Sequence, residues 1–303
     1  MVADTADDHF YKYTSASTGR IVLETAKLRW SSPFLFNDPF DNRIDLGIEG
    51  DPTFVVARAL DKLWSNYNGD EPPHPANRAG LLFQSYGKAD KRMSRQQFDS
   101  TFGPGIEGSI ARGDKRLREL NEKLRLIARQ HKMLCLTKAA SSVPMWAYYA
   151  DNHRGMVLRF RTVPELDSPW PAGAAVIYSQ STPSLMNAEE FSDVLSGRSQ
   201  INHTRALHRR VYTKSIEWSH EREWRVFSGL GRDPDAEFED LRFDEQELGG
   251  VILGCNMPTE SRTAIADLVR RKYPHADLLL AVPSLHEFRL EFAAFEPKRD
   301  SIP

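Results

Sequence analysis

The spacing of apolar and polar residues divides the chain into three parts. Residues 9–46 follow a strand, helix and strand pattern, and residues 51–132 show mostly helical periodicity. Residues 133–296 return to short strands separated by helices. Because no internal repeat or low-complexity linker separates these parts, we expect one α+β domain, residues 1–303, with an all-helical insertion at about 51–132.

The same periodicity predicts the bounds of individual elements. Strands are expected at 9–13, 28–31, 133–137, 156–161, 174–179, 224–228, 250–254, 278–281 and 288–292. Helices are expected from a cap near Ser17 or Thr18, from Pro144, and at 187–196, 200–213 and 258–272. Breaks in the helical insertion are expected at 71–75 and 102–105, which contain proline or glycine.

Composition is typical of a soluble globular protein. The 303 residues are 40% hydrophobic, and the net charge of −2 argues against bulk electrostatic coating of nucleic acid. The acidic residues 1–8 lack the features of a secretory signal, and no run is long and apolar enough to span a membrane. Cys135 and Cys255 each lie in an apolar run, which favours buried thiols in a reducing cytoplasm.

Familiar catalytic motifs are mostly absent. Residues 103–108 match the spacing G-x-G-x-x-G, but helical sequence flanks them and Pro104 interrupts them, so we interpret the match as chance. The chain has no G-x-x-x-x-G-K-[ST], H-E-x-x-H, C-x-x-C or G-x-S-x-G motif. His203 and His208 lie among basic residues, whose charge disfavours a metal ion.

A basic segment at 112–132 has two interpretations. It carries eight Lys or Arg residues against three acids. Leu117, Leu120, Leu124 and Ile127 form an apolar stripe at helical spacing. The segment is therefore either a solvated helix packed through that stripe or a contact surface for RNA, DNA or another polyanion.

The acidic motif Glu221-x-Glu223 opens an apolar strand. At a strand's period of two, Glu221, Glu223 and Arg225 are expected on one face, opposite Trp224 and Val226. One interpretation is a solvated edge strand on which Arg225 screens the glutamates. The other is an acidic site held on a rigid element.

Aromatic and polar residues gather in three further segments. Residues 11–13 lie on the first strand, and the loop at 33–41 concentrates phenylalanine with asparagine and aspartate. Turn formation explains such a loop as readily as ligand binding does. In the third segment, Trp146 and Tyr149 share a helical face, which by default indicates core packing.

Together these segments resemble the bacterial and phage family called domain of unknown function 2971. The matching segments are 11–13, 28–33 running into 36–41, 145–150 with Gly155, and Trp218 with 221–225. The resemblance covers roughly 9–46, 133–161 and 214–255. Tyr148 stands where the family pattern has histidine, so a role of that histidine is not carried over to this chain.

A weaker, fold-level resemblance connects the chain with ADP-ribosyltransferases. Its basis is the first strand, the helix at 20–28, the second strand and the late strand opened by Glu-x-Glu. The resemblance implies mixed and antiparallel sheets around a cleft that cleaves the nicotinamide–ribose bond of NAD, without a metal ion. It implies transfer to an acceptor, protein or nucleic acid, and leaves open a role as toxin, antiviral defence effector or housekeeping modifier.

That resemblance also implies roles for individual residues. Glu223 would be the catalytic carboxylate, and Glu221 would orient the acceptor or assist. Arg225 would neutralise the pyrophosphate or pair with Asp41. The residues implied to bind NAD are Tyr11, Lys12, Tyr13, Ser31, Ser32, Asn37, Asp38, Trp146, Tyr149 and Arg225.

Two other functions fit the same residues. In a Mg²⁺-dependent nuclease or phosphodiesterase, Asp38, Asp41, Glu221 and Glu223 would converge on the metal while the basic segment guided nucleic acid. In a non-catalytic module, the cleft would bind a nucleotide and the insertion would bind a partner.

Overall fold

The computed structural model describes residues 9–41, 45–70, 72–76, 78–89, 93–229 and 231–296. Residues 1–8, on which the expected absence of a secretory signal rests, lie outside these ranges. Two compact units divide the chain. We call Met1–Pro39, Ala128–Gln180 and Lys214–Pro303 the sheet unit, and Phe40–Ile127 and Ser181–Thr213 the helical unit.

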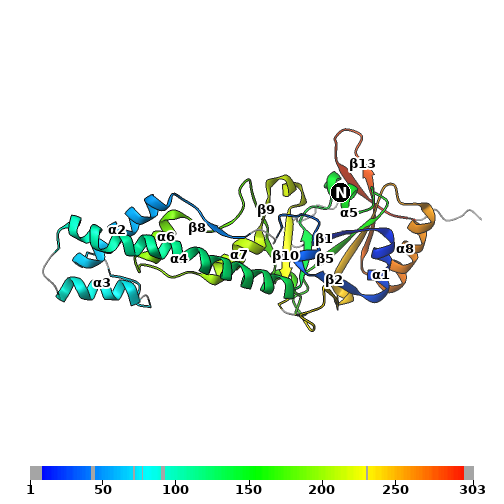
Figure 1. Ribbon diagram of the computed structural model, residues 1–303. Coiled ribbons are helices and arrows are strands. Elements are labelled where there is room, and N and C mark those ends of the chain that lie inside the picture. The colour runs from blue at the N-terminus through cyan, green and yellow to red at the C-terminus, as the bar shows by residue number, and fades with distance from the viewer. Residues whose placement is uncertain are drawn as a thin grey trace, which may run out of the picture. The chain divides into compact units, whose positions relative to one another are not determined.

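The sheet unit contains a ten-stranded mixed sheet (Figure 1). Eight strands follow the order β11-β2-β4-β1-β5-β12-β13-β14, while β10 pairs with β4 and β6. Their bounds are β1 His9–Thr14, β2 Lys27–Ser31, β4 Met133–Thr137, β5 Met156–Arg161, β6 Ala174–Ala175, β10 Glu223–Phe227, β11 Phe238–Arg242, β12 Leu248–Leu253, β13 Asp277–Pro283 and β14 Leu290–Ala294. Helices pack on both faces of this mixed sheet.

Helices α1 (Ala16–Thr25) and α8 (Thr259–Lys272) pack together on one face (Figure 1). The Ser15 hydroxyl caps α1 by accepting from the Thr18 amide, so the cap lies two or three residues before the expected position. Helix α5 (Val143–Tyr149) packs on the other face. Because β1 is buried on both sides, its Phe10 joins the first core while Tyr11 and Tyr13 join the second.

Strand β4 is the branching point of the sheet. One edge of β4 pairs with β10 along its whole length. The other edge pairs with β1 only at Tyr11↔Thr137 and with β2 only at Ser31↔Met133. Strands β1 and β2 therefore part along the middle of β4, which leaves room for side chains or a ligand there.

The helical unit consists of helices with a two-stranded parallel pair. Its elements are α2 Pro52–Asn68, α3 Arg78–Ala89, most of α4 Arg95–Gln130, α6 Ala188–Leu195, α7 His203–Tyr212, β3 Gly47–Ile48 and β8 Ser184–Met186. One apolar cluster forms around Phe98 and another around Leu124 and Phe191. Residues 181–213 belong to this unit, although the sequence pattern placed the helical insertion at 51–132 alone.

One expected break is wrong, because α4 runs without interruption through 102–105 (Figure 1). Pro104 lies inside this helix. The helix tolerates it because contacts of Phe98 and Ile106 with a buried apolar cluster outweigh the local cost of proline. Strand β11 was also not expected, since its burial alternates with an exposed face rich in charge. Short 3₁₀ turns complete the chain: η1 Pro33–Leu35, η2 Trp170–Ala172, η3 Ile216–Glu221 and η4 Glu245–Glu247.

Candidate functional site

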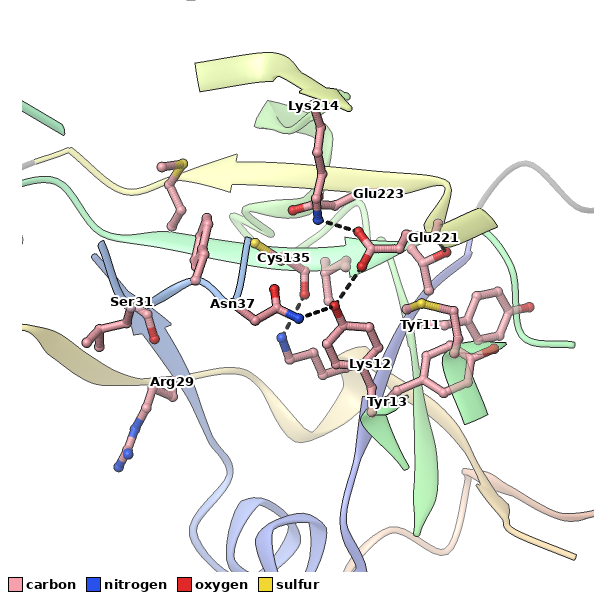
Figure 2. A pocket seen from close by; sticks show the side chains of 17 residues that line it. Tyr11, Lys12, Tyr13, Arg29, Ser31, Asn37, Cys135, Lys214, Glu221 and Glu223 are labelled. Atoms are coloured by element: carbon pink, nitrogen blue, oxygen red, sulfur yellow. Dashed lines mark hydrogen bonds and ion pairs between the residues drawn. The ribbon is translucent and has the colours of Figure 1, made fainter. Parts of the chain in front are cut away.

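A cavity of about 310 Å³ lies in the sheet unit where β1 and β2 part along β4 (Figure 2). Loop residues around Phe36 and Asn37, together with Tyr149 of α5, also line it. Lys214, Glu221 and Glu223 come from the segment that precedes and begins β10. We call this cavity the split-sheet cleft.

Eight of the twelve predicted site residues line the split-sheet cleft. They are Tyr11, Lys12, Tyr13, Ser31, Asn37, Tyr149, Glu221 and Glu223. The residues come from β1, β2, the following loop, α5, η3 and β10. The sheet thus brings together segments that are more than a hundred residues apart in the chain.

Four predicted residues do not line the cleft. Trp146 is fully buried in the core, where its indole N–H donates to the Ala140 carbonyl (2.8 Å), so it is no wall for a ligand. Ser32 caps η1 through the Phe34 amide. Asp38 is buried outside the lining, and the Arg225 guanidinium is fully buried against Glu223 rather than open to a pyrophosphate.

The two glutamates do not share a strand face as predicted. Glu221 ends the 3₁₀ turn η3, Arg222 takes a left-handed conformation (φ 45°), and Glu223 begins β10. The two carboxylates therefore come from different elements, and both accept a hydrogen bond from Lys214. Glu221 and Glu223 are 3% and 6% exposed, and Arg225 is fully buried, which contradicts the solvated-edge interpretation.

Lys214 joins the two carboxylates. Its Nζ donates to Glu221 Oε2 (2.5 Å; Figure 2). It also donates to Glu223 Oε2 (3.1 Å). Lys214 lies on β9 (Thr213–Ser215) and is itself buried. Burial lowers the pKa of Lys214, but the adjacent Glu223 and Glu221 outweigh this and raise it above its usual value.

Glu223 is held on all sides by donors. Arg225 Nε donates to Glu223 Oε1 (2.8 Å), and Arg225 Nη2 donates to Oε2 (3.0 Å), beside the bond from Lys214. Burial raises the pKa of Glu223, but Arg225 and then Lys214 lower it well below its usual range. Glu223 is therefore an anion whose charge is balanced inside the protein.

Glu221 is less fully bonded. The Tyr149 hydroxyl donates to Glu221 Oε1 (2.6 Å), and Asn37 Nδ2 donates to that hydroxyl (3.0 Å; Figure 2). Among the described residues, each oxygen of Glu221 thus accepts one hydrogen bond, whereas a carboxylate offers about four acceptor positions. Burial and the bond to Glu221 raise the pKa of Tyr149, so Tyr149 stays a neutral donor.

Backbone contacts fix the positions of these side chains. The Thr137 hydroxyl donates to the Glu221 carbonyl (2.5 Å), and the Tyr178 hydroxyl accepts from the Glu223 amide (2.8 Å). Lys12 Nζ donates to the Cys135 carbonyl (2.8 Å), in the stretch of β4 that has no strand partner on β1 or β2. A lysine therefore satisfies a carbonyl in the gap and presents an ammonium group to the cleft.

Sequence reasoning missed Lys214 as a site residue. It also missed Arg29 and Cys135, which line the cleft. The period of a strand could not reveal Lys214, because its proximity to the glutamates depends on the 3₁₀ turn and the left-handed Arg222. Burial raises the pKa of Cys135 well above its usual value, as does the neighbouring Glu223, so its thiol is protonated.

Within the described ranges, no group of three or more His, Cys, Asp or Glu side chains is arranged to hold a metal ion. Instead, the Lys214 ammonium lies between the two carboxylates. A divalent ion there would meet a fixed positive charge. None of the described helices combines the length and apolar content needed to cross a bilayer.

Comparison with family models gives a match over part of the chain. The model of the family described as "Protein of unknown function (DUF2971)" matches residues 145–226. This range contains most of α5, Lys214 and both glutamates. The match supports the family resemblance expected from the sequence. No curated protein and no solved structure matches the chain significantly.

Proposed function

We propose that the split-sheet cleft binds NAD and cleaves its nicotinamide–ribose bond, transferring ADP-ribose to an acceptor. The observation that carries this proposal is the convergence of Glu221 and Glu223 with Tyr13, Ser31 and Tyr149 in one cavity. These residues lie on separate elements, and packing alone does not account for two buried carboxylates beside a cavity. A volume of about 310 Å³ is at the small end of ligand sites and suits the nicotinamide riboside portion.

The chemistry of this reaction needs a carboxylate next to the ribose. Loss of nicotinamide develops an oxocarbenium-like charge, which a carboxylate stabilises through space or through a ribose hydroxyl. The cleft holds its carboxylates on β10 and on η3, which is tied to β4 by Thr137. Such anchoring keeps the negative charge in place before the reaction starts.

The hydrogen bonds favour an exchange of the two expected roles. Glu223 accepts two hydrogen bonds from Arg225 and one from Lys214, so little of its acceptor capacity is left for a substrate. Glu221 accepts two, from Lys214 and Tyr149. In our proposal Glu221 contacts the ribose, and Glu223 holds Lys214 and thereby positions Glu221.

The remaining lining residues supply the other contacts. Tyr149 and Phe36 offer aromatic surface for nicotinamide, and Asn37 offers an amide close to Tyr149. Lys12 has an ammonium group at the cleft that donates to one acceptor among the described residues, the Cys135 carbonyl. A lysine donates up to three hydrogen bonds, so Lys12 retains donors for a phosphate.

The test is incubation of the purified chain with labelled NAD and a whole-cell extract. Wild type should release nicotinamide and transfer label to protein or nucleic acid, and both Glu221→Gln and Glu223→Gln should lower the rate at least a hundredfold, roughly 2.7 kcal/mol of activation free energy. Glu217→Gln, an exposed glutamate outside the lining, is the matched control and should keep the wild-type rate.

Three results would overturn the proposal. The first is a folded wild-type chain that neither binds NAD nor releases nicotinamide with extract present. The second is an activity that EDTA abolishes and Mg²⁺ restores, which would favour the metal-dependent nuclease. The third is full biological effect in Glu221→Gln and Glu223→Gln with tight ligand binding retained, which would favour a non-catalytic nucleotide-binding module.

A further inference from the structure

The helical unit contains a second, apolar cavity of about 770 Å³. It lies between α4, α6 and α7, with β8 closing one side. Its lining includes Leu117, Leu120, Leu124 and Ile127, the stripe on α4 expected from the sequence to pack against a core. All lining residues belong to the helical unit, so the cavity is described within that unit alone. We call it the apolar cavity.

The stripe on α4 is only partly used for packing. Leu124 is buried, but Leu117 and Leu120 remain half-buried at the cavity, as does Leu207 of α7. Apolar surface left facing water is unfavourable by roughly 25 cal/mol per Å². The side chains of the helical unit therefore leave a space that an apolar ligand would fill with a gain in free energy.

The shape of the lining favours a chain over a compact ligand. Its positions on α4 extend from Ser109 to Ile127, which at the helical rise corresponds to about 27 Å. The volume is within the range of roughly 300–1,000 Å³ that is typical of small-molecule sites. A long unbranched hydrocarbon chain fits both an elongated outline and an apolar wall.

The edge of the apolar cavity is cationic. Arg116 and Lys123 are exposed lining residues two helical turns apart, and neither forms an ion pair with any residue in the described part of the chain. Glu119, the acid in the lining, pairs with Lys115 (4.0 Å). His203 adds a further group that can bind an anion. The edge thus complements a negative headgroup beside an apolar chain.

We propose that the apolar cavity binds a long-chain fatty acid, with its hydrocarbon tail along the α4 stripe and its carboxylate at Arg116 or Lys123. This site is separate from the split-sheet cleft and does not depend on its proposed function. It also gives a role to the basic face of α4 other than polyanion contact. Lys132 does not belong to this basic face as expected, because it follows the end of α4 and is fully buried.

The test uses the full-length chain and dansyl-undecanoic acid, a fluorescent fatty acid. Its fluorescence should rise with a stoichiometry of one, and unlabelled palmitate should displace it. Leu120→Trp, which fills the cavity with an indole, should weaken binding at least tenfold, about 1.4 kcal/mol. If Leu120→Trp unfolds in circular dichroism, Leu117→Trp serves the same purpose from one turn away.

The headgroup has its own test. Arg116→Ala/Lys123→Ala should weaken palmitate binding about tenfold and change hexadecanol binding less than twofold, because the alcohol has no charge to lose. Arg118→Ala/Arg129→Ala is the matched control, since it removes two exposed charges of α4 outside the lining. This control should bind palmitate like wild type.

The proposal is overturned if the folded chain does not bind dansyl-undecanoic acid, or if both tryptophan variants bind it like wild type. Equal loss of palmitate binding in the two double-alanine variants would mean that general charge attracts the ligand. That result would remove the proposed headgroup site. Displacement by RNA but not by palmitate would assign the basic face of α4 to a polyanion and would also contradict the proposal.

Discussion

The two cavities differ in how they treat charge. The split-sheet cleft holds Glu221, Glu223 and Lys214 in buried positions, on elements tied to a central sheet. The apolar cavity holds leucine at its wall and leaves Arg116 and Lys123 exposed at its edge. A buried charge must be balanced within the protein, whereas an exposed charge is solvated and remains available to a ligand.

This difference indicates which charged residues are needed for folding and which are available to a ligand. In the cleft, two carboxylates are balanced by Lys214 and Arg225, so the four groups sum to zero. Removing one partner leaves the others uncompensated in a poorly solvated place. At the edge of the apolar cavity, a substitution is expected to change ligand binding with little effect on folding.

The largest effect is expected from Lys214→Met. Methionine keeps the length of the side chain but removes the ammonium group that separates Glu221 from Glu223. We expect a loss of about 3–5 kcal/mol in the free energy of unfolding, the usual cost of breaking a buried ion pair. Urea denaturation gives the free energy, and hydrogen exchange of β10 peptides locates the loss in the sheet unit.

Lys115→Met is the control for this substitution, since Lys115 is exposed and its ion pair with Glu119 is long (4.0 Å). It should change the free energy of unfolding by less than about 0.5 kcal/mol. Adding Glu221→Gln to Lys214→Met should recover part of the lost free energy of unfolding, because Lys214 and Glu221 are coupled. A Lys214→Met variant as stable as the control would remove the buried-charge account of the cleft.

The helical unit offers a comparison through its own buried lysine. Lys62 Nζ pairs with Glu189 (2.9 Å) and Asp193 (2.6 Å) and donates to the Ser192 hydroxyl (2.7 Å). Glu189 is half-exposed, and Asp193 is about a third exposed, unlike the buried partners of Lys214. Because water can solvate the remaining acids, we expect Lys62→Met to cost about 1–3 kcal/mol, less than Lys214→Met.

Acid provides a second measurement for Lys62. Hydrogen bonds from Arg58 and Lys62 lower the pKa of Glu189 to about 2. The resulting stabilisation is present above the unfolded pKa of about 4.3 and is lost as pH falls toward the folded value. In Lys62→Met, the free energy of unfolding should fall less steeply as the pH is lowered. An unchanged acid profile would mean that Arg58 alone sets the pKa of Glu189.

Comparison of the two units also shows how far the sequence predicts this protein. Short apolar runs predicted β4 and β5 with their observed bounds, Met133–Thr137 and Met156–Arg161. Strand β5 contributes to the cores on both faces of the sheet, and β4 contributes Leu134 and Leu136 to the first core. Local capping predicted the start of α1 to within two or three residues. Such features depend on neighbours in the chain, which a pattern records directly.

Features that depend on distant contacts were missed. The break expected at 102–105 is wrong, because buried contacts of α4 outweigh the propensity of glycine and proline. Lys214 was missed because a left-handed Arg222 brings the glutamates toward it. Trp146 was expected to form an aromatic wall for the ligand, but its side chain packs in the second core. The sequence identified which polar and charged residues could carry chemistry. Their contacts could be found only from the folded structure.

Removal of one hydroxyl should have a smaller effect on the cleft. The Tyr178 hydroxyl accepts from the Glu223 amide (2.8 Å), so Tyr178→Phe leaves that amide without this acceptor. We expect a loss of about 1–2 kcal/mol in the free energy of unfolding, measured in urea. Tyr148→Phe removes the hydroxyl of a tyrosine that is 71% exposed and should have almost no effect.

Alkali gives a separate measurement of the buried position of Tyr178. Burial raises the pKa of Tyr178 to about 12. An unfolded tyrosine ionises near pH 10, so the stabilisation is present below pH 10 and is lost as pH rises toward the folded value. Tyr178→Phe should remove part of this loss in urea titrations across that range. A wild-type phenolate titration complete near pH 10 would contradict the buried position of Tyr178.

The smallest expected effect has the opposite sign and concerns the helical unit alone. Gly105 lies exposed within α4, and a methyl group added there would meet no other atom within 4 Å. Gly105→Ala should therefore raise the free energy of unfolding by about 0.5–1 kcal/mol, the usual gain in an exposed helix interior. The same substitution at Gly87 of α3 is the matched contrast, because the added methyl group would collide with the Tyr67 carbonyl and destabilise the unit.

Hydrogen exchange should show slower exchange in α4 and unchanged exchange in β4 for Gly105→Ala. Destabilisation by Gly105→Ala would mean that α4 does break at 102–105, and slower exchange in β4 would mean that the two units do not unfold separately.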